Sequence, residues 1–359
     1  MNVPLAPVLL AGAAVTGLVV VLLCAVATAH LLRGRRRARD VQRKRELTPL
    51  VHALLDDDPA DGAPRADVVG AHADLDAIVL ELLPQLRGTD RQVLRQVLAE
   101  RGVVPRAVAD LSARKSWRRG RAVTLLGSAA GTDHLAAMAA LLDDRSPEVR
   151  CAAARALGKA GDPAAVAPLL RATRGGTGLP HGVVGMALLD LGAAALPALR
   201  DALTASRGNA RELVAELLGV HGDASATAAL EGLLRDAAED LPVRRAAATA
   251  LGRIGSPTST EPLVAALTNS PDHRLQRAAA EALGRVGDPV ATVPLLAGLA
   301  APDVAVRSVC ADALARLGGE GRTALQEVAG GTGAAAPVAR AALDELLAGP
   351  RRPEPAGAR

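Results

Sequence analysis

The sequence predicts an all-α protein: a right-handed α-solenoid of stacked helical hairpins that follows one N-terminal transmembrane helix. Three observations lead to this fold class. The 22 residues "VRCAAARALGKAGDPAAVAPLL" at 149–170 recur as "VRRAAATALGRIGSPTSTEPLV" at 243–264 and "LQRAAAEALGRVGDPVATVPLL" at 275–296. No residue from Val8 to Leu32 carries a formal charge, and a dense cluster of basic residues follows this run directly.

The uncharged run has the length of a membrane span. A helix of this length, at ~1.5 Å rise per residue, exceeds the ~30 Å of a bilayer's hydrocarbon core. Between Arg33 and Arg45, eight basic residues accompany a single acid, Asp40. Positive charge beside a span stays in the cytoplasm. We therefore expect a short extracytoplasmic tail at 1–7, a transmembrane helix at 8–32 and a basic juxtamembrane segment at 33–45 that contacts anionic lipid headgroups.

This topology places the protein in the cell (inner) membrane as a single-pass protein, with its N-terminus outside and everything after residue 33 in the cytoplasm. The alternative is a cleaved signal peptide, because "ATA" at 27–29 has the small-x-small form of a cleavage site. A basic segment before the apolar run is missing, however, and the arginine cluster after it is typical of a stop-transfer signal. The three cysteines, Cys24, Cys151 and Cys310, are too widely spaced for a disulfide framework or a zinc site.

Each repeat has the pattern of two helices. Apolar residues at i, i+3, i+4, i+7 and i+8 form one stripe in the first helix: Val149, Ala152, Ala153, Ala156 and Leu157. Ser146 with Pro147, and Asp162 with Pro163, mark the two helix starts, and Gly161 lies between the helices. Equivalent glycines recur every 30–33 residues: Gly131, Gly161, Gly192, Gly222, Gly255, Gly287 and Gly318. The sequence therefore predicts seven units, and "PVARAALDELL" supplies one more helix.

The frame V-R-x-x-A-A-x-A-L-G-x-x-G-D-P, followed by A-V-x-P-L-L, resembles short bacterial HEAT repeats of the PBS-lyase HEAT-like type. The resemblance covers residues 117–348 and implies a solenoid with a scaffold-like role and no catalytic residue. The unit at 181 departs most, because His181 replaces the usual Arg and Leu189 the usual Gly, which leaves its turn geometry open. Heavy use of Ala, Gly and Arg, with only three lysines, is typical of a GC-rich genome and favours an actinobacterial-like, membrane-anchored member of this group.

The ends of the repeat array have weaker patterns. Residues 46–116 predict a helical adaptor, or N-terminal cap, of four short segments, because "TDRQVLRQVLAERG" at 89–102 shows helical spacing of its apolar residues. Residues 349–359 are expected to be a disordered tail. Where the repeats begin, Trp117 lies among Arg114, Lys115, Arg118, Arg119 and Arg121. We favour a cap in which Trp117 packs on the first repeat, and the alternative is that this end rests on the bilayer.

Several recurring polar positions have a structural interpretation. One set of arginines and one set of aspartates hold fixed places in the unit: Arg150, Arg211, Arg244 and Arg307, and Asp162, Asp223 and Asp288. We interpret them as Arg–Asp pairs within or between turns rather than as an anion-binding ladder. Recurring prolines imply a shared kink or a later helix start: Pro168, Pro197, Pro262 and Pro294.

No motif in the chain predicts catalysis, a cofactor or a metal. The glycine-rich "RGGTGLPHG" at 174–182 lacks the ending of a phosphate-binding loop and has no strand before it. His134, His181 and His221 are far apart in sequence and have no accompanying acids, which argues against a metal site. We therefore predict no catalytic, cofactor-binding or metal-binding residues and expect the protein not to be an enzyme.

Charge argues against nucleic acid. The formal net charge is +4, but residues 46–359 alone carry 34 basic and 37 acidic residues, a net charge of −3. A groove that follows DNA should be positive, and base stacking uses aromatic rings, of which this chain has one. The sequence therefore predicts a membrane-tethered cytoplasmic scaffold that binds a protein partner, itself membrane-associated, such as an envelope-assembly enzyme. The alternative is an enzyme, or enzyme subunit, of the bilin-lyase kind.

Overall fold

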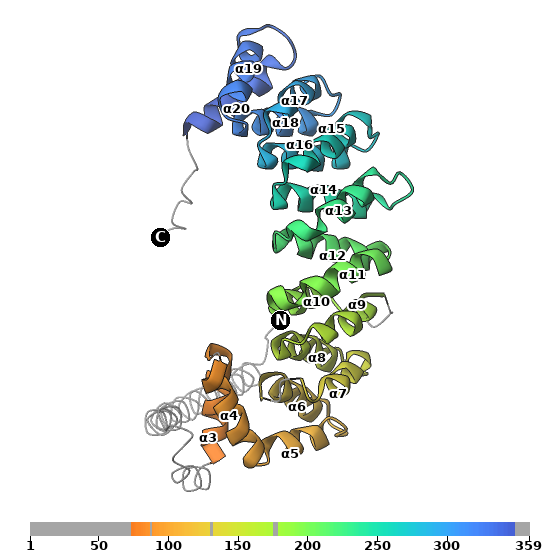
Figure 1. Cartoon of the computed structure of the whole chain (residues 1–359), viewed down its shortest axis with the longest axis vertical. Helices are drawn as coiled ribbons and strands as arrows, with labels where there is room; N and C mark the ends of the chain where they lie inside the picture. The colour runs from red at the N-terminus through yellow and green to blue at the C-terminus, as the bar shows by residue number, and fades with distance from the viewer. Residues whose placement is uncertain (1–72, 87, 130–131, 175–178, 349–359) are drawn as a thin grey trace, which may run out of the picture. The chain divides into compact units, whose positions relative to one another are not determined.

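The computed structural model describes residues 73–86, 88–129, 132–174 and 179–348 (Figure 1). The predicted transmembrane helix at 8–32, the basic segment at 33–45 and the predicted tail at 349–359 lie outside these residues. Among the described helices, no single one is both long and apolar enough to cross a membrane; only the pair His181–Asp190 and Gly192–Ala205, bent by 106°, passes on length and composition when joined. The chain divides into two compact units, Met1–Arg106 and Ala107–Arg359.

The described part of the first unit is helical, as its apolar spacing predicts. It contains α3 (Ala73–Leu82), the 3-10 turn η1 (Leu83–Gln85) and α4 (Gly88–Glu100), and the division between the units falls inside α5 (Val103–Asp110). Its core consists of buried aliphatic side chains: Leu75, Val79, Leu83, Leu94 and Leu98. An ion pair between Arg101, directly after α4, and Asp76 of α3 joins these two helices.

The second unit is a row of helical hairpins. The first helices of the hairpins, and the final helix, are α6 (Ser116–Ala129), α8 (Pro147–Ala160), α10 (His181–Asp190), α12 (Gly208–Val220), α14 (Leu241–Ile254), α16 (His273–Val286), α18 (Val304–Arg316) and α20 (Ala336–Ala348). The second helices are α7 (Leu135–Ala140), α9 (Val166–Arg174), α11 (Leu196–Ala205), α13 (Thr227–Arg235), α15 (Thr260–Asn269), α17 (Thr292–Gly298) and α19 (Gly319–Gly330). These described helices confirm the predicted seven hairpins and the additional helix.

Within this second unit the hairpins stack in two layers (Figure 1). The layer of first helices lies on the inner side of the curve, and the layer of second helices lies on the outer side. Between the layers lie Val, Ala and Leu side chains of the predicted stripes: Val149, Ala153, Ala156 and Leu157 are buried, and Ala152 is half-buried at the edge. A hairpin cannot bury such a stripe alone, so stacking neighbours is what creates the core.

The turn inside each hairpin needs glycine. Six of the seven predicted turn glycines are described, and each has a positive φ between 63° and 86°: Gly161, Gly192, Gly222, Gly255, Gly287 and Gly318. L-residues with a side chain rarely adopt this left-handed conformation, which explains the repeat of glycine. Gly192 keeps it too, so the unit at 181 retains its turn despite Leu189.

After the turn, the second helix starts late. In three units an aspartate side chain accepts a hydrogen bond from the backbone N–H two residues on and begins a 3-10 turn, as with Asp162 and Ala164 at 2.8 Å. The α-helix proper begins next, so that Pro168 and its equivalents lie in its first turn, where a missing N–H costs little. Of the two predicted caps, Asp162 is confirmed. Ser146 lies at the N-cap of α8 without capping it, and its hydroxyl donates to Glu148 instead.

A second set of glycines sets the spacing of the inner layer. A Cβ on Gly252 would lie 2.6 Å from the Ala282 Cα in the next unit, and four other contacts repeat this geometry: Gly127 with Ala156, Gly158 with Ala187, Gly219 with Ala250, and Gly284 with Ala313. Only glycine allows the first helices to approach so closely. This tight spacing of the inner helices is consistent with their place on the concave side.

One contact in the inner layer departs from this rule. Leu189 occupies the glycine position of α10, and Leu217 occupies the facing alanine position of α12. These two helices touch far less than the other neighbours in the layer. The departure at Leu189 therefore changes the stacking of two units rather than the turn.

Candidate functional site

Most of the concave surface of the second unit is formed by three positions on each of six first helices, α8 to α18. Residues at i, i+4 and i+8 share one helix face. In α14 these are Arg245, Thr249 and Arg253, on the side opposite the buried Val243 and Leu251. The equivalent sets are Cys151, Arg155 and Lys159; Gly182, Met186 and Asp190; Glu212, Glu216 and Val220; Arg277, Glu281 and Arg285; and Ser308, Asp312 and Arg316.

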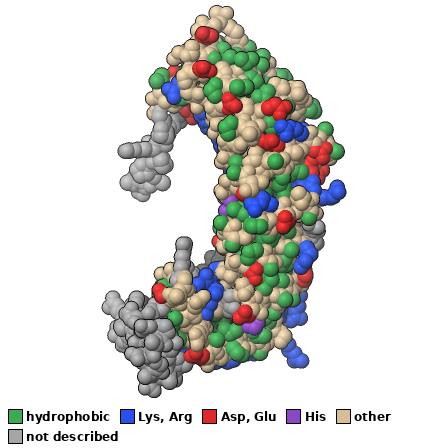
Figure 2. Space-filling view, in the orientation of Figure 1, with side chains coloured by type: hydrophobic (Ala, Val, Ile, Leu, Met, Phe, Trp, Pro, Cys, Tyr) green, Lys and Arg blue, Asp and Glu red, His purple; other side chains and the backbone are tan. Residues whose placement is uncertain are grey.

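Charge on this surface changes from helix to helix. The α12 set is acidic, and burial together with the nearby Glu212 carboxylate raises the pKa of Glu216, although part of its side chain is exposed. The α14 and α16 sets are mostly basic. On the side of the molecule visible in Figure 2, acidic and basic side chains of the second unit are also interspersed. The surface thus carries local charged regions.

The recurring arginines predicted to pair with aspartates bind backbone carbonyls instead. The guanidinium of Arg150 donates to the Asp144 carbonyl at 2.8 Å, that of Arg244 to the Leu234 carbonyl at 3.1 Å, and that of Arg307 to the Ala301 carbonyl at 2.8 Å. Arg211 bonds both the Thr204 carbonyl and the Glu239 carboxylate. The Arg–Asp prediction was therefore wrong about the partners: these side chains reach back to the loop before their own helix and satisfy carbonyls left free at the end of the preceding helix.

The aspartates of the predicted pairs lie in the second-helix layer. Besides its cap, Asp223 forms an ion pair with Arg200 at 2.9 Å, and Asp288 accepts a hydrogen bond from the Thr260 hydroxyl at 2.8 Å. Both contacts join neighbouring repeats. The two recurring sets thus each make contacts within the repeat array, but they do not pair with each other as predicted.

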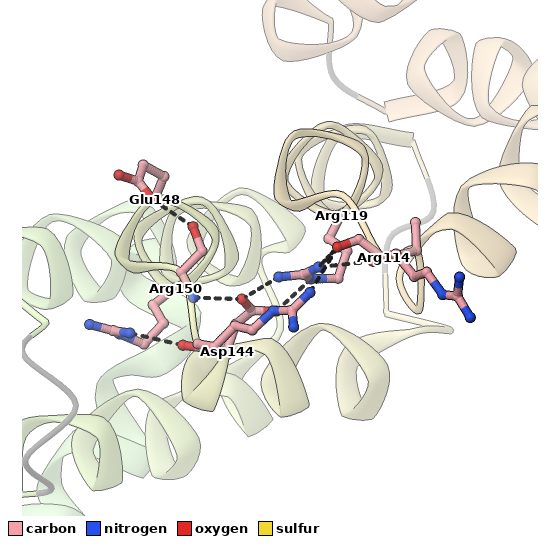
Figure 3. Close-up of polar contacts among 8 residues, drawn as sticks. Arg114, Arg119, Asp144, Glu148 and Arg150 are labelled. Atoms are coloured by element: carbon pink, nitrogen blue, oxygen red, sulfur yellow. Dashed lines mark hydrogen bonds and ion pairs between the residues drawn. The ribbon is translucent and has the colours of Figure 1, made fainter.

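Arg119 is the first member of the arginine set, and its environment is the most enclosed. Its Nε and Nη2 donate to the two carboxylate oxygens of Asp144, each at 2.7 Å, and its Nη1 donates to the Ala113 carbonyl at 2.8 Å (Figure 3). Arg119 holds the pKa of Asp144 below its usual range by this hydrogen bonding. The backbone N–H of Ser146 adds a further bond to the same carboxylate. The group fixes the first repeat to the second.

Three other arginines on the concave surface have no such partners. Arg245, Arg274 and Arg277, together with Ala278, Glu281 and Val309, line an open depression of about 400 Å³ between α14, α16 and α18. Sequence reasoning missed this cluster. The signal that was available is a departure from the repeat: the Arg245 position is Cys151, Glu212 and Ser308 in other units.

The remaining sequence candidates do not converge. His134 precedes α7, His181 begins α10 and His221 ends α12, and among the described residues no group of three or more His, Cys, Asp or Glu is arranged to hold a metal. Residues 175–178 of the glycine-rich stretch lie outside the described residues. The predicted burial of Trp117 was wrong: the side chain is 61% exposed, because it begins α6 on the face turned away from the buried Val123 and Leu126.

Comparison with known proteins agrees with this architecture. A family model described as HEAT repeats matches residues 104–177, 196–284, 237–315 and 260–348. The one gap between these ranges, 178–195, contains α10, the helix in which Leu189 replaces glycine. Comparison with curated proteins found no match.

Among solved structures, the chain is similar to the complex of CpcE and CpcF of phycocyanin lyase from Nostoc sp. PCC7120, at 24% identity and a TM-score of 0.29, over 67% of this chain and 86% of that chain. It is also similar to human deoxyhypusine hydroxylase in complex with glycerol, at 20% identity and a TM-score of 0.31, over 75% and 94% of the two chains. A third is the Kap121p structure bound to RanGTP, at 15% identity and a TM-score of 0.49, over 78% and 38%. Because the family model matches more than half of the chain, and its repeats coincide with the hairpins described above, the chain belongs to the family of HEAT-repeat proteins.

Proposed function

We propose that this protein is a membrane-tethered scaffold whose repeat domain faces the cytoplasm and binds another protein along its concave surface. The observation that carries the proposal is the inner layer of first helices, which presents the same three outward positions in successive repeats. Stacked helices ~10 Å apart extend seven repeats over about 70 Å, which is long enough to hold a domain or an extended segment.

The tether is the uncharged run at 8–32 with the basic cluster at 33–45. A tethered domain meets partners at the same membrane, so the partner is a membrane protein, and an envelope-assembly enzyme of the inner membrane suits this location. A reporter that is active only in the cytoplasm should work when fused after Arg359. Activity of an export-dependent reporter at that position would instead reverse the topology and favour a cleaved signal peptide.

The exposed start of α6 supports a second contact with the bilayer. Trp117 projects into solvent, and among the described residues Arg114, Lys115 and Arg121 have no carboxylate partner for their side chains. Tryptophan favours the membrane interface, and each basic side chain near anionic headgroups contributes ~1 kcal/mol. This end of the repeat domain therefore lies against the lipid surface.

Site-specific photo-crosslinking in cells tests the binding surface. The full chain would carry p-benzoylphenylalanine at Met186 or Thr249 on the inner helices, or at Val293 on the outer helix α17 as the matched control. We expect crosslinks to a membrane protein from the two inner positions and none from Val293. Crosslinks from Val293 alone would place the binding surface on the outer layer and contradict the proposal. Absorbance and mass spectrometry of the purified chain for a bound tetrapyrrole distinguish the bilin-lyase alternative.

A further inference from the structure

We infer that the depression lined by Arg245, Arg274 and Arg277 is a binding site for a short acidic segment, a run of Asp or Glu side chains, in the protein partner. The inference rests on the proposed protein-binding function and names the chemistry that the concave surface recognises. Three observations carry it: the three guanidinium groups form no ion pair or hydrogen bond within the described residues, they surround one hollow, and their positions are not a requirement of the repeat.

The first observation is that no described side chain or carbonyl makes a direct polar contact with the three guanidinium groups. None of the three arginines forms an ion pair or hydrogen bond with another described residue, in contrast to Arg244, whose Nε donates to the Leu234 carbonyl. The acid that lines the same depression, Glu281, is already engaged, because its carboxylate accepts from Arg285 at 2.6 Å. Three positive charges therefore face the hollow with their donors available to a ligand.

The second observation is that the three arginines surround one depression from two adjacent helices. The depression is open and measures about 400 Å³, within the usual range of ligand sites. Arg245 comes from α14, whereas Arg274 and Arg277 lie one turn apart on α16. Guanidinium groups bind carboxylates in planar, bidentate geometry, and two adjacent helices present them from two sides. This arrangement suits several carboxylates in one segment better than a single small anion.

The third observation is that the repeat does not explain the cluster. The recurring arginine of the repeat, Arg244, is used for a carbonyl at the preceding loop, whereas Arg245 and Arg277 occupy the next position and project outward. Like charges held together repel one another and destabilise the free protein. An acidic ligand would neutralise the three charges and remove this repulsion, so the cluster is more stable with such a ligand bound.

The surroundings favour a short acidic peptide over a nucleic acid. On the α12 side of Arg245 the concave surface becomes acidic through Glu212 and Glu216, and Glu216 already interacts electrostatically with Arg245 and Arg253. A long polyanion that follows the concave surface would meet these carboxylates. A segment with a few acidic residues fits within the basic region of α14 and α16.

The test uses the full chain in lipid nanodiscs and an octaglutamate peptide that carries a fluorophore and a photoreactive diazirine. Fluorescence anisotropy measures affinity, and mass spectrometry of the photo-crosslinked protein locates the peptide, which separates this depression from the basic segment at 33–45. We expect crosslinks within α14, α16 and α18, binding that weakens with salt, and a loss of affinity at this site of about tenfold or more in Arg245→Gln/Arg274→Gln/Arg277→Gln.

The matched control removes the same number of charges from exposed arginines outside the concave sets, as Arg171→Gln/Arg322→Gln/Arg340→Gln, and should retain the crosslinks and the affinity. Circular dichroism establishes that both variants fold. Equal binding by the two variants, or crosslinks only outside the three helices, would overturn the inference. So would a single-stranded oligonucleotide that displaces the peptide and binds more tightly, since the site would then recognise phosphate. If the peptide does not bind at this depression but Thr249 still crosslinks to a protein in cells, the proposed protein-binding function stands and only the inference of an acidic ligand is wrong.

Discussion

Arg119 and Asp144 form a two-point ion pair, and the two side chains are each only 7% exposed. Arg119 lies in α6 and Asp144 in the loop that joins α7 to α8, where the same carboxylate accepts a hydrogen bond from the Ser146 N–H, so the pair acts as a fixed joint between the first two repeats (Figure 3). Removing one member of a buried pair leaves the other charge without compensation, which costs more than the intact pair contributes.

Asp144→Asn should therefore destabilise the fragment 46–359 at pH 7. Because the pKa of Asp144 is lowered in the folded state, the contribution of the carboxylate is fully present above the unfolded pKa of ~3.9 and is lost as the pH falls through the lower folded value. The difference in urea midpoint between wild type and variant should then narrow below about pH 4. Asp143→Asn, at an exposed neighbour, is the control and should change little; a difference that does not depend on pH would contradict this account.

Gly252→Ala should destabilise the array by about 1–3 kcal/mol, because the new methyl group meets the backbone of the next helix at Ala282. The control is Gly232→Ala in α13, where a Cβ has no neighbour within 4 Å; it should stabilise by up to about 1 kcal/mol through helix propensity. Urea unfolding followed by circular dichroism measures both. If the two substitutions had the same sign, the close approach of the inner helices would be wrong.

Gly255→Ala should cost about 1–2 kcal/mol for a different reason, since the residue has a φ of +73° and no crowding atom nearby. Gly255→Asn should cost less, because asparagine tolerates the left-handed region better than alanine. Thermal unfolding of the two variants checks the order. If Gly255→Ala and Gly255→Asn lower the melting temperature equally, the left-handed backbone conformation is not the reason for glycine at this position.

Cys310 should be unreactive in the folded protein. Burial raises its pKa to about 12, so that only about one molecule in ten thousand carries the thiolate at pH 8. In a Cys24→Ser/Cys151→Ser background, a disulfide reagent should modify Cys310 only after urea unfolds the last repeats. Because the pKa of Cys310 is raised in the folded state, the neutral thiol contributes fully to the free energy of unfolding below the unfolded pKa of ~8.5. This contribution is lost as the pH rises toward 12. Cys310→Ala should therefore abolish this loss of stability at alkaline pH. Rapid modification without urea would contradict the burial.

The emission of Trp117, the one tryptophan in the chain, should report contact with lipid. Without vesicles, the exposed indole of the fragment 46–359 should emit at long wavelength and be accessible to a soluble quencher. Anionic vesicles should shift the emission to the blue and protect it, and salt should reverse both changes. Neutral vesicles are the control. If the emission does not change when anionic vesicles are added, α6 does not contact the membrane, and the segment 8–32 is left as the proposed membrane contact.

The sequence determined the local structure of this protein, because its signals act within a few residues. Apolar spacing specifies a helix face, and glycine at a left-handed position specifies a turn, so that the hairpins of 117–348 and the family were predictable. Recurring Asp162 and Pro168 were likewise readable as a cap and a late helix start, since both act on their own backbone.

Only the tertiary structure decided which groups meet across helices. Spacing gives an angle around one helix but no distance to the next, so it did not show that Arg150 would reach a carbonyl, that Gly252 would touch Ala282, or that Trp117 would stay exposed. The cluster of Arg245, Arg274 and Arg277 arises for the same reason: two helices bring it together, and their separation depends on a glycine-to-alanine contact that only the stacked repeats create.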